Sequence, residues 1–126
     1  MNILSEFESS LDELNELAIK LSNVAEVGDI FFLEGSLGVG KTSLARFMIN
    51  SLFDKHKLSR PASIRSPSFP ILINYPLLNF EICHFDLYRL LHKDELIEIS
   101  FFEEIQHNIS IIEWPNIILN NFKLTN

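Results

Sequence analysis

The segment Gly35-Ser36-Leu37-Gly38-Val39-Gly40-Lys41-Thr42 matches the pattern G-x-x-x-x-G-K-[ST] of a phosphate-binding loop without a gap. Three of the four glycines in the chain lie in this loop. A chain that uses so little glycine elsewhere needs unusual backbone conformations here. We therefore expect a loop whose backbone amides surround a phosphate group, followed by a helix that begins near Lys41.

The chemistry of phosphate binding explains each residue type in the loop. The glycines let the backbone curl so that several N–H groups point at one phosphate, and the positive end of the following helix adds to this field. The ammonium group of Lys41 reaches the β- and γ-phosphates, and the Thr42 hydroxyl is a hard oxygen ligand for Mg²⁺. The predicted nucleotide-binding residues are Gly35, Leu37, Gly38, Val39, Gly40, Lys41, Thr42 and Ser43, and Lys41 is also a predicted catalytic residue.

The residues on both sides of the loop have the pattern that this motif requires. The apolar run Ile30–Leu33 predicts a buried strand that leads into the loop, and residues 41 to about 53 predict an amphipathic helix that follows it. Upstream, apolar residues at helical spacing predict a helix from Leu11 to Val24 with a capping box at Ser10, ended by Gly28 and Asp29.

The rest of the chain alternates between strand and helix patterns. Two runs separated by a turn at Pro76–Asn79 predict an antiparallel hairpin. A long acidic segment predicts one amphipathic helix, and a second apolar run predicts another buried strand. These elements are expected at Ile71–Tyr75, Phe80–Asp86, Asp94–Ile105 and Ile109–Glu113, whereas Asn116–Asn126 is weakly patterned.

Two acidic residues stand at the ends of predicted strands. Asp86 ends the second strand of the hairpin, and Glu113 ends the last strand. Ligands of α/β sheets bind beyond the carboxyl ends of the strands, and magnesium in nucleotide sites usually needs a carboxylate there. Both acids are therefore candidate magnesium ligands and catalytic groups. Each could equally be a solvated acid just past a strand.

Composition limits the classes of protein that fit. A chain of 126 residues with 47% hydrophobic residues predicts one folded domain, and a net charge of −7 does not favour a broad nucleic-acid-binding face. The single cysteine, Cys83, excludes an internal disulfide and is expected to be a packed core thiol. No signal peptide and no membrane-spanning run is visible, so we expect a cytoplasmic protein with no membrane contact.

The loop alone does not identify the class of nucleotide-binding protein. The motifs N-K-x-D and D-x-x-G are absent, and no glycine follows Gly40, which disfavours a GTPase. A small-molecule kinase needs arginines in a lid, but the four arginines of the chain are not clustered. An ATPase, a small-molecule kinase and a non-catalytic nucleotide-binding module all remain open on these grounds.

Four segments, taken in order, resemble one family. They are the phosphate-binding loop, Ser66-Pro67-Ser68-Phe69, His84-Phe85-Asp86-Leu87-Tyr88-Arg89-Leu90 and Ile112-Glu113-Trp114-Pro115. Together they resemble the TsaE (YjeE) family of bacterial P-loop ATPases. The resemblance implies a three-layer α/β sandwich of the P-loop NTPase type with a mixed, mainly parallel sheet. It also implies ATP hydrolysis with Mg²⁺ that supports the TsaB–TsaD complex in tRNA N6-threonylcarbamoyladenosine modification, with tRNA met only through that complex.

The resemblance also implies roles for single residues. Asp86 helps to hold magnesium or the phosphates, and Glu113 binds magnesium and polarises the attacking water. Ser66 and Ser68 lie in a switch-like segment that faces the γ-phosphate. His84 has no role assigned in this way, and by its apolar surroundings it is expected to be a core histidine. Residues 1–126 are expected to form one domain in which the C-terminal strands of the family are shortened.

Overall fold

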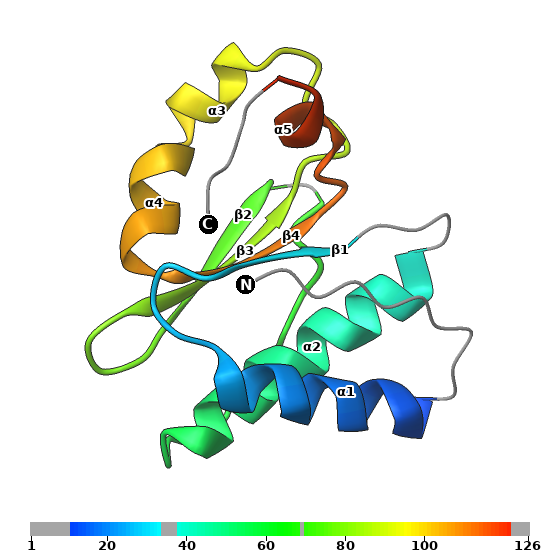
Figure 1. Ribbon diagram of the computed structural model, residues 1–126, viewed down its shortest axis with the longest axis vertical. Coiled ribbons are helices and arrows are strands. Elements are labelled where there is room, and N and C mark those ends of the chain that lie inside the picture. The colour runs from blue at the N-terminus through cyan, green and yellow to red at the C-terminus, as the bar shows by residue number, and fades with distance from the viewer. Residues whose placement is uncertain (1–10, 34–37, 69, 122–126) are drawn as a thin grey trace.

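The computed structural model describes residues 11–33, 38–68 and 70–121, and within these the side chains of 38–42 and 119–121 are not described. Helices and strands are interspersed along the described chain (Figure 1). They are α1 (Leu11–Val24), β1 (Ile30–Leu33), α2 (Gly38–Lys55), β2 (Leu72–Pro76), β3 (Glu81–Asp86), α3 (Asp94–Glu98), α4 (Phe101–His107), β4 (Ile109–Glu113) and α5 (Asn116–Asn121).

The four described strands form one mixed sheet in the order β1-β4-β3-β2. Strand β4 pairs in parallel with β1 on one side and with β3 on the other, whereas β2 and β3 form an antiparallel hairpin. This confirms the predicted mixed, mainly parallel sheet and the predicted hairpin. Because β1, β4 and β3 run in the same direction, their carboxyl ends reach the same edge of the sheet.

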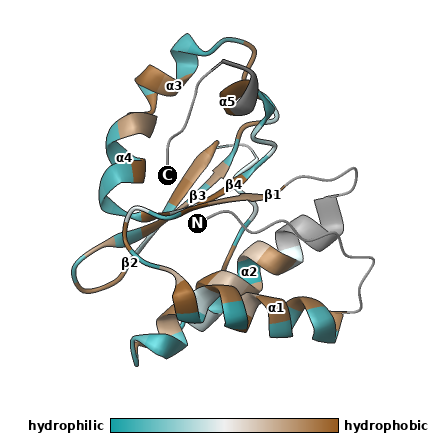
Figure 2. Cartoon of the chain, in the orientation of Figure 1, coloured by the Kyte–Doolittle hydropathy of each residue, from teal (hydrophilic) through white to brown (hydrophobic). Residues whose placement is uncertain are grey.

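Helices cover both faces of the sheet, so the molecule has the predicted three layers. Figure 1 shows α1 and α2 on one face and α3, α4 and α5 on the other. In Figure 2 the strands between the two helical layers carry the apolar colours, while polar colours lie on the outer sides of the helices. Each helical layer packs against the sheet and forms a separate apolar core. One core includes Leu21, Met48 and Ile49, and the other includes Phe85, Phe101 and Ile105.

Alternation along the strands decides which face each side chain occupies. Ile82 of β3 and Ile111 of β4 belong to the core under α1 and α2, whereas Cys83 and Ile112 belong to the core under α3 and α4. The same alternation repeats up to the last residue of each strand.

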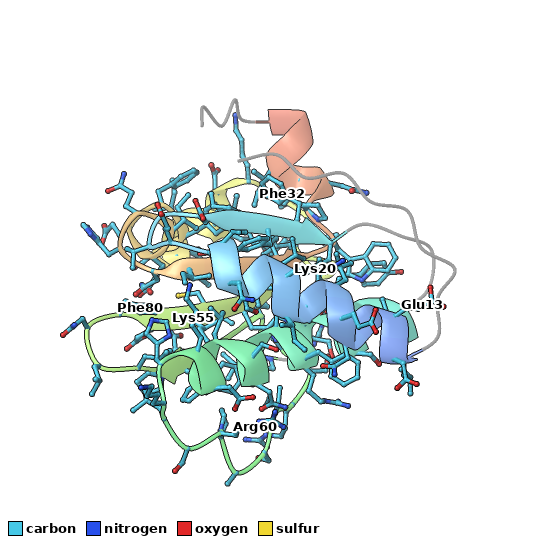
Figure 3. All side chains as sticks on the ribbon, turned by 60° about the horizontal axis from the view of Figure 1, so that its bottom comes forward. Glu13, Lys20, Phe32, Lys55, Arg60 and Phe80 are labelled. Atoms are coloured by element: carbon cyan, nitrogen blue, oxygen red, sulfur yellow. The ribbon has the colours of Figure 1, made fainter. Side chains whose placement is uncertain are left out.

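Helices α1 and α2 are joined at one end by a lysine. Lys55, in the last turn of α2, donates hydrogen bonds from Nζ to the carbonyl oxygens of Ser22, Asn23 and Ala25, at 3.0, 3.2 and 3.3 Å. These carbonyls lie at the carboxyl end of α1, where a helix favours a positive charge. Figure 3 shows Lys55 reaching toward that end of α1. The contact joins the carboxyl ends of the two helices.

The structure corrects three predicted elements. The predicted helix Asp94–Ile105 is two helices, because Ser100 adopts a left-handed conformation with φ of 55° between α3 and α4. The weakly patterned tail contains a helix, α5. Helix α2 begins at Gly38 instead of near Lys41. The predicted bounds of α1, β1 and β4 are confirmed, whereas the capping box at Ser10 lies outside the described residues.

Candidate functional site at the carboxyl edge of the sheet

Backbone hydrogen bonds fix the three strand ends at this edge relative to one another. Asp86 lies opposite Glu113 in the β3–β4 register, and Leu33 lies opposite Glu113 in the β1–β4 register. Just beyond the strands, the Leu87 amide donates to the Glu113 carbonyl at 3.0 Å, and the Trp114 amide donates to the Leu33 carbonyl at 3.4 Å. The two candidate acids therefore stand side by side on neighbouring strands, an arrangement that the sequence alone did not establish.

Both acids face the layer that contains α2. Asp86 and His84 share the face of Ile82 on β3, and Glu113 shares the face of Ile111 on β4. Helix α2 starts only five residues after Leu33, so its amino end lies within about 18 Å of the end of β1. Helix α2 therefore packs on the face to which both acids belong, and its first residue follows closely after the end of β1.

Asp86 is buried and held in part by the backbone. Its side chain and main chain together are 6% exposed, and its Oδ1 accepts a hydrogen bond from the Tyr88 amide at 3.0 Å. A carboxylate that accepts from an amide two residues later forms a local turn that limits its rotation. The carboxylate is thereby kept at the end of β3 instead of turning out into solvent.

Glu113 is more deeply buried and is paired with a histidine. Oε2 of Glu113 lies 2.7 Å from Nε2 of His84, and the two side chains are 3% and 1% exposed. A carboxylate removed from water needs such a partner, because its desolvation is otherwise very unfavourable. The expectation that His84 is a core histidine is confirmed by its burial, but this contact with Glu113 was not foreseen.

The predicted switch segment lies beside the same edge. The Asp86 amide donates to the Ile71 carbonyl at 2.9 Å, and the Ile71 amide donates to the Pro67 carbonyl. Ser66 and Ser68 are exposed, and the hydroxyl of Ser66 donates to that of Ser68 over 3.3 Å. Their hydroxyls are therefore accessible in a segment anchored to the end of β3, and their contact with a phosphate stays a prediction.

Two aromatic rings stand just past the acids. The rings of Tyr88 and Trp114 pack with centroids 4.9 Å apart, and Trp114 has φ of 56°, a left-handed conformation that a bulky residue rarely adopts. Such strain is retained where the surroundings impose it and is common at functional sites. Trp114 thus turns the chain sharply directly after Glu113.

The carboxylates of Asp86 and Glu113 are of the ligand type that magnesium prefers. Two carboxylates are hard oxygen donors, which Mg²⁺ prefers, and it typically takes one or two of them together with substrate phosphates and water. Within residues 11–33, 38–68 and 70–121 there is no group of three or more His, Cys, Asp or Glu that could form a complete cage. The two carboxylates therefore fit the part of a magnesium site that a protein supplies.

The sequence model of the family described as "Threonylcarbamoyl adenosine biosynthesis protein TsaE" matches residues 8–125, nearly the whole chain. The chain belongs to the TsaE family. The family model spans the loop, the switch segment and both strand-end acids, which are the four segments that carried the resemblance.

Individual members of the TsaE family are similar to this chain over most of its length. A Rickettsia felis protein named tRNA threonylcarbamoyladenosine biosynthesis protein TsaE is 39% identical over 85% of this chain and 60% of its own length. A protein of the same name from Aquifex aeolicus is 28% identical over 83% of this chain and 71% of its own. The chain thus spans about three fifths of the length of its Rickettsia felis relative.

A solved structure supports the fold. The crystal structure of YdiB from Bacillus subtilis superimposes with a TM-score of 0.58 over 91% of this chain and 66% of the other, at 23% identity. This agreement concerns the arrangement of helices and strands. Among the described residues, no helix combines the length and apolar character that crossing a bilayer requires.

The described residues cover only part of the predicted TsaE-type site. Gly35 and Leu37 lie outside them, and for Gly38, Val39, Gly40, Lys41 and Thr42 only the helical backbone is described. Ser43 is half-buried in the first turns of α2. The structure brings Asp86 and Glu113 together, and their predicted roles in binding and catalysis stay predictions.

A second polar cluster, on the opposite face and at the opposite end of β3, was missed. Oε2 of Glu104 accepts hydrogen bonds from Asn74, Cys83 and Asn108, at 3.4, 3.3 and 3.0 Å. Nδ2 of Asn74 also donates to Glu81 at 2.6 Å. We call these five residues the α4 cluster. The sequence pattern of the predicted helix Asp94–Ile105 does not indicate these contacts, because Asn74 and Cys83 reach Glu104 only where α4 packs against the hairpin.

Proposed function

We propose that this chain binds ATP with Mg²⁺ at the carboxyl edge of its sheet and hydrolyses it. The proposal depends on one observation: Asp86 and Glu113 lie side by side, buried, on the sheet face that carries α2. That helix directly follows the G-x-x-x-x-G-K-[ST] segment. Phosphoryl transfer to water needs positioning and charge stabilisation more than covalent chemistry, and these groups supply both.

The proposed roles follow from the chemistry of each group. The loop amides and Lys41 bind the phosphates, while Thr42 and the two carboxylates hold the magnesium ion. Magnesium neutralises charge that develops on the phosphate oxygens. Glu113, the more deeply buried acid, orients the attacking water and accepts its proton. Ser66 and Ser68 provide hydroxyls toward the γ-phosphate.

We further propose that hydrolysis supports tRNA N6-threonylcarbamoyladenosine modification next to the anticodon, in a complex with TsaB and TsaD. Membership of the TsaE family and the names of the similar proteins support this proposal. The acidic charge of −7 is consistent with tRNA contacts made mainly by the partners, because phosphate contacts need clustered Lys and Arg.

Calorimetry and single-turnover hydrolysis test the proposal together. ATP and GTP are titrated into the chain with Mg²⁺, with and without purified TsaB and TsaD, and hydrolysis is followed under the same conditions. We expect ATP to bind and to be hydrolysed faster when the partners are present. Lys41→Ala should weaken triphosphate binding, because it removes the positive charge that faces the phosphates.

Two other outcomes would contradict the proposal. Binding without any turnover, even with the partners, would favour a non-catalytic nucleotide-binding module. Transfer of the γ-phosphate to a metabolite would favour a small-molecule kinase. If Lys41→Ala binds ATP as tightly as the unmodified chain, the loop is not the phosphate site.

A further inference from the structure

The buried pair of His84 and Glu113 connects two neighbouring strands at the proposed site. In the parallel register His84 lies opposite Ile111, and Asp86 lies opposite Glu113. The imidazole therefore reaches diagonally, two positions along β4, to make its 2.7 Å contact with Oε2 of Glu113. No hydrogen-bond partner for the other ring nitrogen, Nδ1, occurs in the described part of the chain.

Packing and stability do not explain this pair. Taking a carboxylate and an imidazole out of water is costly, and apolar side chains of similar volume often serve stability equally well or better. The neighbouring positions on the same face, Ile82 and Ile111, show that apolar side chains fit this layer. The pair lies instead at the carboxyl edge of this face, where Asp86 and Glu113 end their strands.

We propose that His84 is a positioning residue that holds the Glu113 carboxylate in one orientation for hydrolysis. An ionised carboxylate can only accept hydrogen bonds, so Nε2 of His84 carries the hydrogen and donates it to Oε2. With Oε2 fixed, rotation of the carboxyl group is restricted and the direction of Oε1 is set. This inference rests on the proposed function, because it assigns His84 a task in the same site.

The two acids are then oriented by different means. Asp86 is held by a backbone amide two residues away, which any sequence could provide. Glu113 has a longer side chain with more rotatable bonds, and it is held by a side chain from the neighbouring strand. Partners that orient a catalytic or metal-binding group in this way often matter almost as much as the group itself.

Four proteins form the test: the unmodified chain, His84→Phe, Glu113→Ala and the double variant. Phenylalanine keeps a ring of similar size and removes the donor. We expect His84→Phe to slow single-turnover ATP hydrolysis with TsaB and TsaD by about 10- to 100-fold. In the Glu113→Ala background the same substitution should cause no further loss, because the group that His84 positions is already absent. His84→Gln, whose amide can donate to Oε2, should recover part of the rate.

Ile82→Ala is the matched control for a purely structural effect. It removes a fully buried side chain from the same strand and the same face, two residues before His84. We expect it to lower the melting temperature while leaving the hydrolysis rate per folded molecule unchanged. An equal loss of rate from His84→Phe in both backgrounds, or no loss in either, would overturn the inference. The same holds if Ile82→Ala slows hydrolysis as much as His84→Phe does.

A second measurement separates this inference from the proposed function. If the unmodified chain hydrolyses no ATP, the proposed hydrolase activity is wrong. The same four proteins are then compared by the Mg²⁺ concentration that half-saturates binding of a non-hydrolysable ATP analogue. His84→Phe should raise that concentration only when Glu113 is present. The same concentration for all four proteins would overturn the positioning role.

Discussion

The acids at the two ends of strand β3 are held in different ways. At the amino end, in the α4 cluster, Glu104 is held by two amides and a thiol that join α4 to the hairpin. At the carboxyl end, Glu113 is held by an imidazole from the neighbouring strand and lies beside Asp86. The α4 cluster supplies each acid with neutral donors and ties two elements together. The other end places two acids side by side on the sheet face that α2 covers. Residue type alone therefore does not separate a structural acid from a candidate functional one, whereas the donors and the position in the sheet distinguish the two groups.

The largest effect that we expect distinguishes the two ends by activity. Glu113→Gln keeps the shape of the side chain and removes its charge and its basicity, so single-turnover ATP hydrolysis should fall by about 100-fold or more. Binding of an ATP analogue should be mostly retained. The matched substitution Glu104→Gln should leave the rate per folded molecule unchanged. The comparison fails if the two glutamines affect hydrolysis equally, or if Glu113→Gln hydrolyses ATP at the normal rate.

A smaller effect should distinguish the two ends by stability. Glu104→Ala leaves the donors of Asn74 and Asn108 without their shared acceptor, so the free energy of unfolding should fall by about 1–3 kcal/mol. Urea denaturation followed by circular dichroism measures this change. Glu103→Ala, at the exposed neighbouring position on α4, is the control and should have almost no effect. If both substitutions lower the free energy of unfolding by the same amount, the α4 cluster does not stabilise the fold.

The order of the elements could be predicted because the apolar runs and the glycine loop are local signals. The break at Ser100 could not, since Ile97, Phe101 and Ile105 follow one another at intervals of four residues, as they would in one helix. Packing of Phe101 and Ile105 against the sheet outweighs the conformational cost of the left-handed residue. Helix α5 was missed because it is short and rich in asparagine. Ile118 of α5 is buried against the sheet, and this tertiary contact is not visible in the local sequence.

For the site, the sequence identified the candidate acids but not how they meet. Asp86 and Glu113 were found because each directly follows an apolar run. Their adjacency depends on the parallel pairing of β3 with β4, which joins segments far apart in the chain. The contact of His84 with Glu113 depends on strand register in the same way, and the contacts of Glu104 with Asn74 and Cys83 depend on the packing of α4 against the hairpin. No local pattern contains that information, so these contacts appeared only in the structure.

The smallest expected effect concerns the thiol of the α4 cluster at alkaline pH. Burial, and then the nearby Glu104 carboxylate, raise the pKa of Cys83 well above its ordinary value of 9.0. Below pH 9.0 the thiol is neutral in both the folded and unfolded chains, so its contribution to stability is complete there. Above that pH the unfolded chain releases a proton that the folded chain keeps. The free energy of unfolding should therefore decrease, with a slope approaching about 1.4 kcal/mol per pH unit.

Cys83→Ala isolates this contribution, because alanine has no proton to release. Urea denaturation between about pH 8 and pH 10 should give a steeper fall for the unmodified chain than for the variant, by at most one proton. Burial also raises the pKa of Tyr75 from its ordinary value of 10.0, so its contribution begins at higher pH and is common to both proteins. Parallel curves would mean that Cys83 titrates normally in the folded chain. In that case water reaches the thiol, and the α4 cluster is more open than its hydrogen bonds indicate. The contrast between the α4 cluster and the proposed ligand-binding end of β3 would then rest on activity alone.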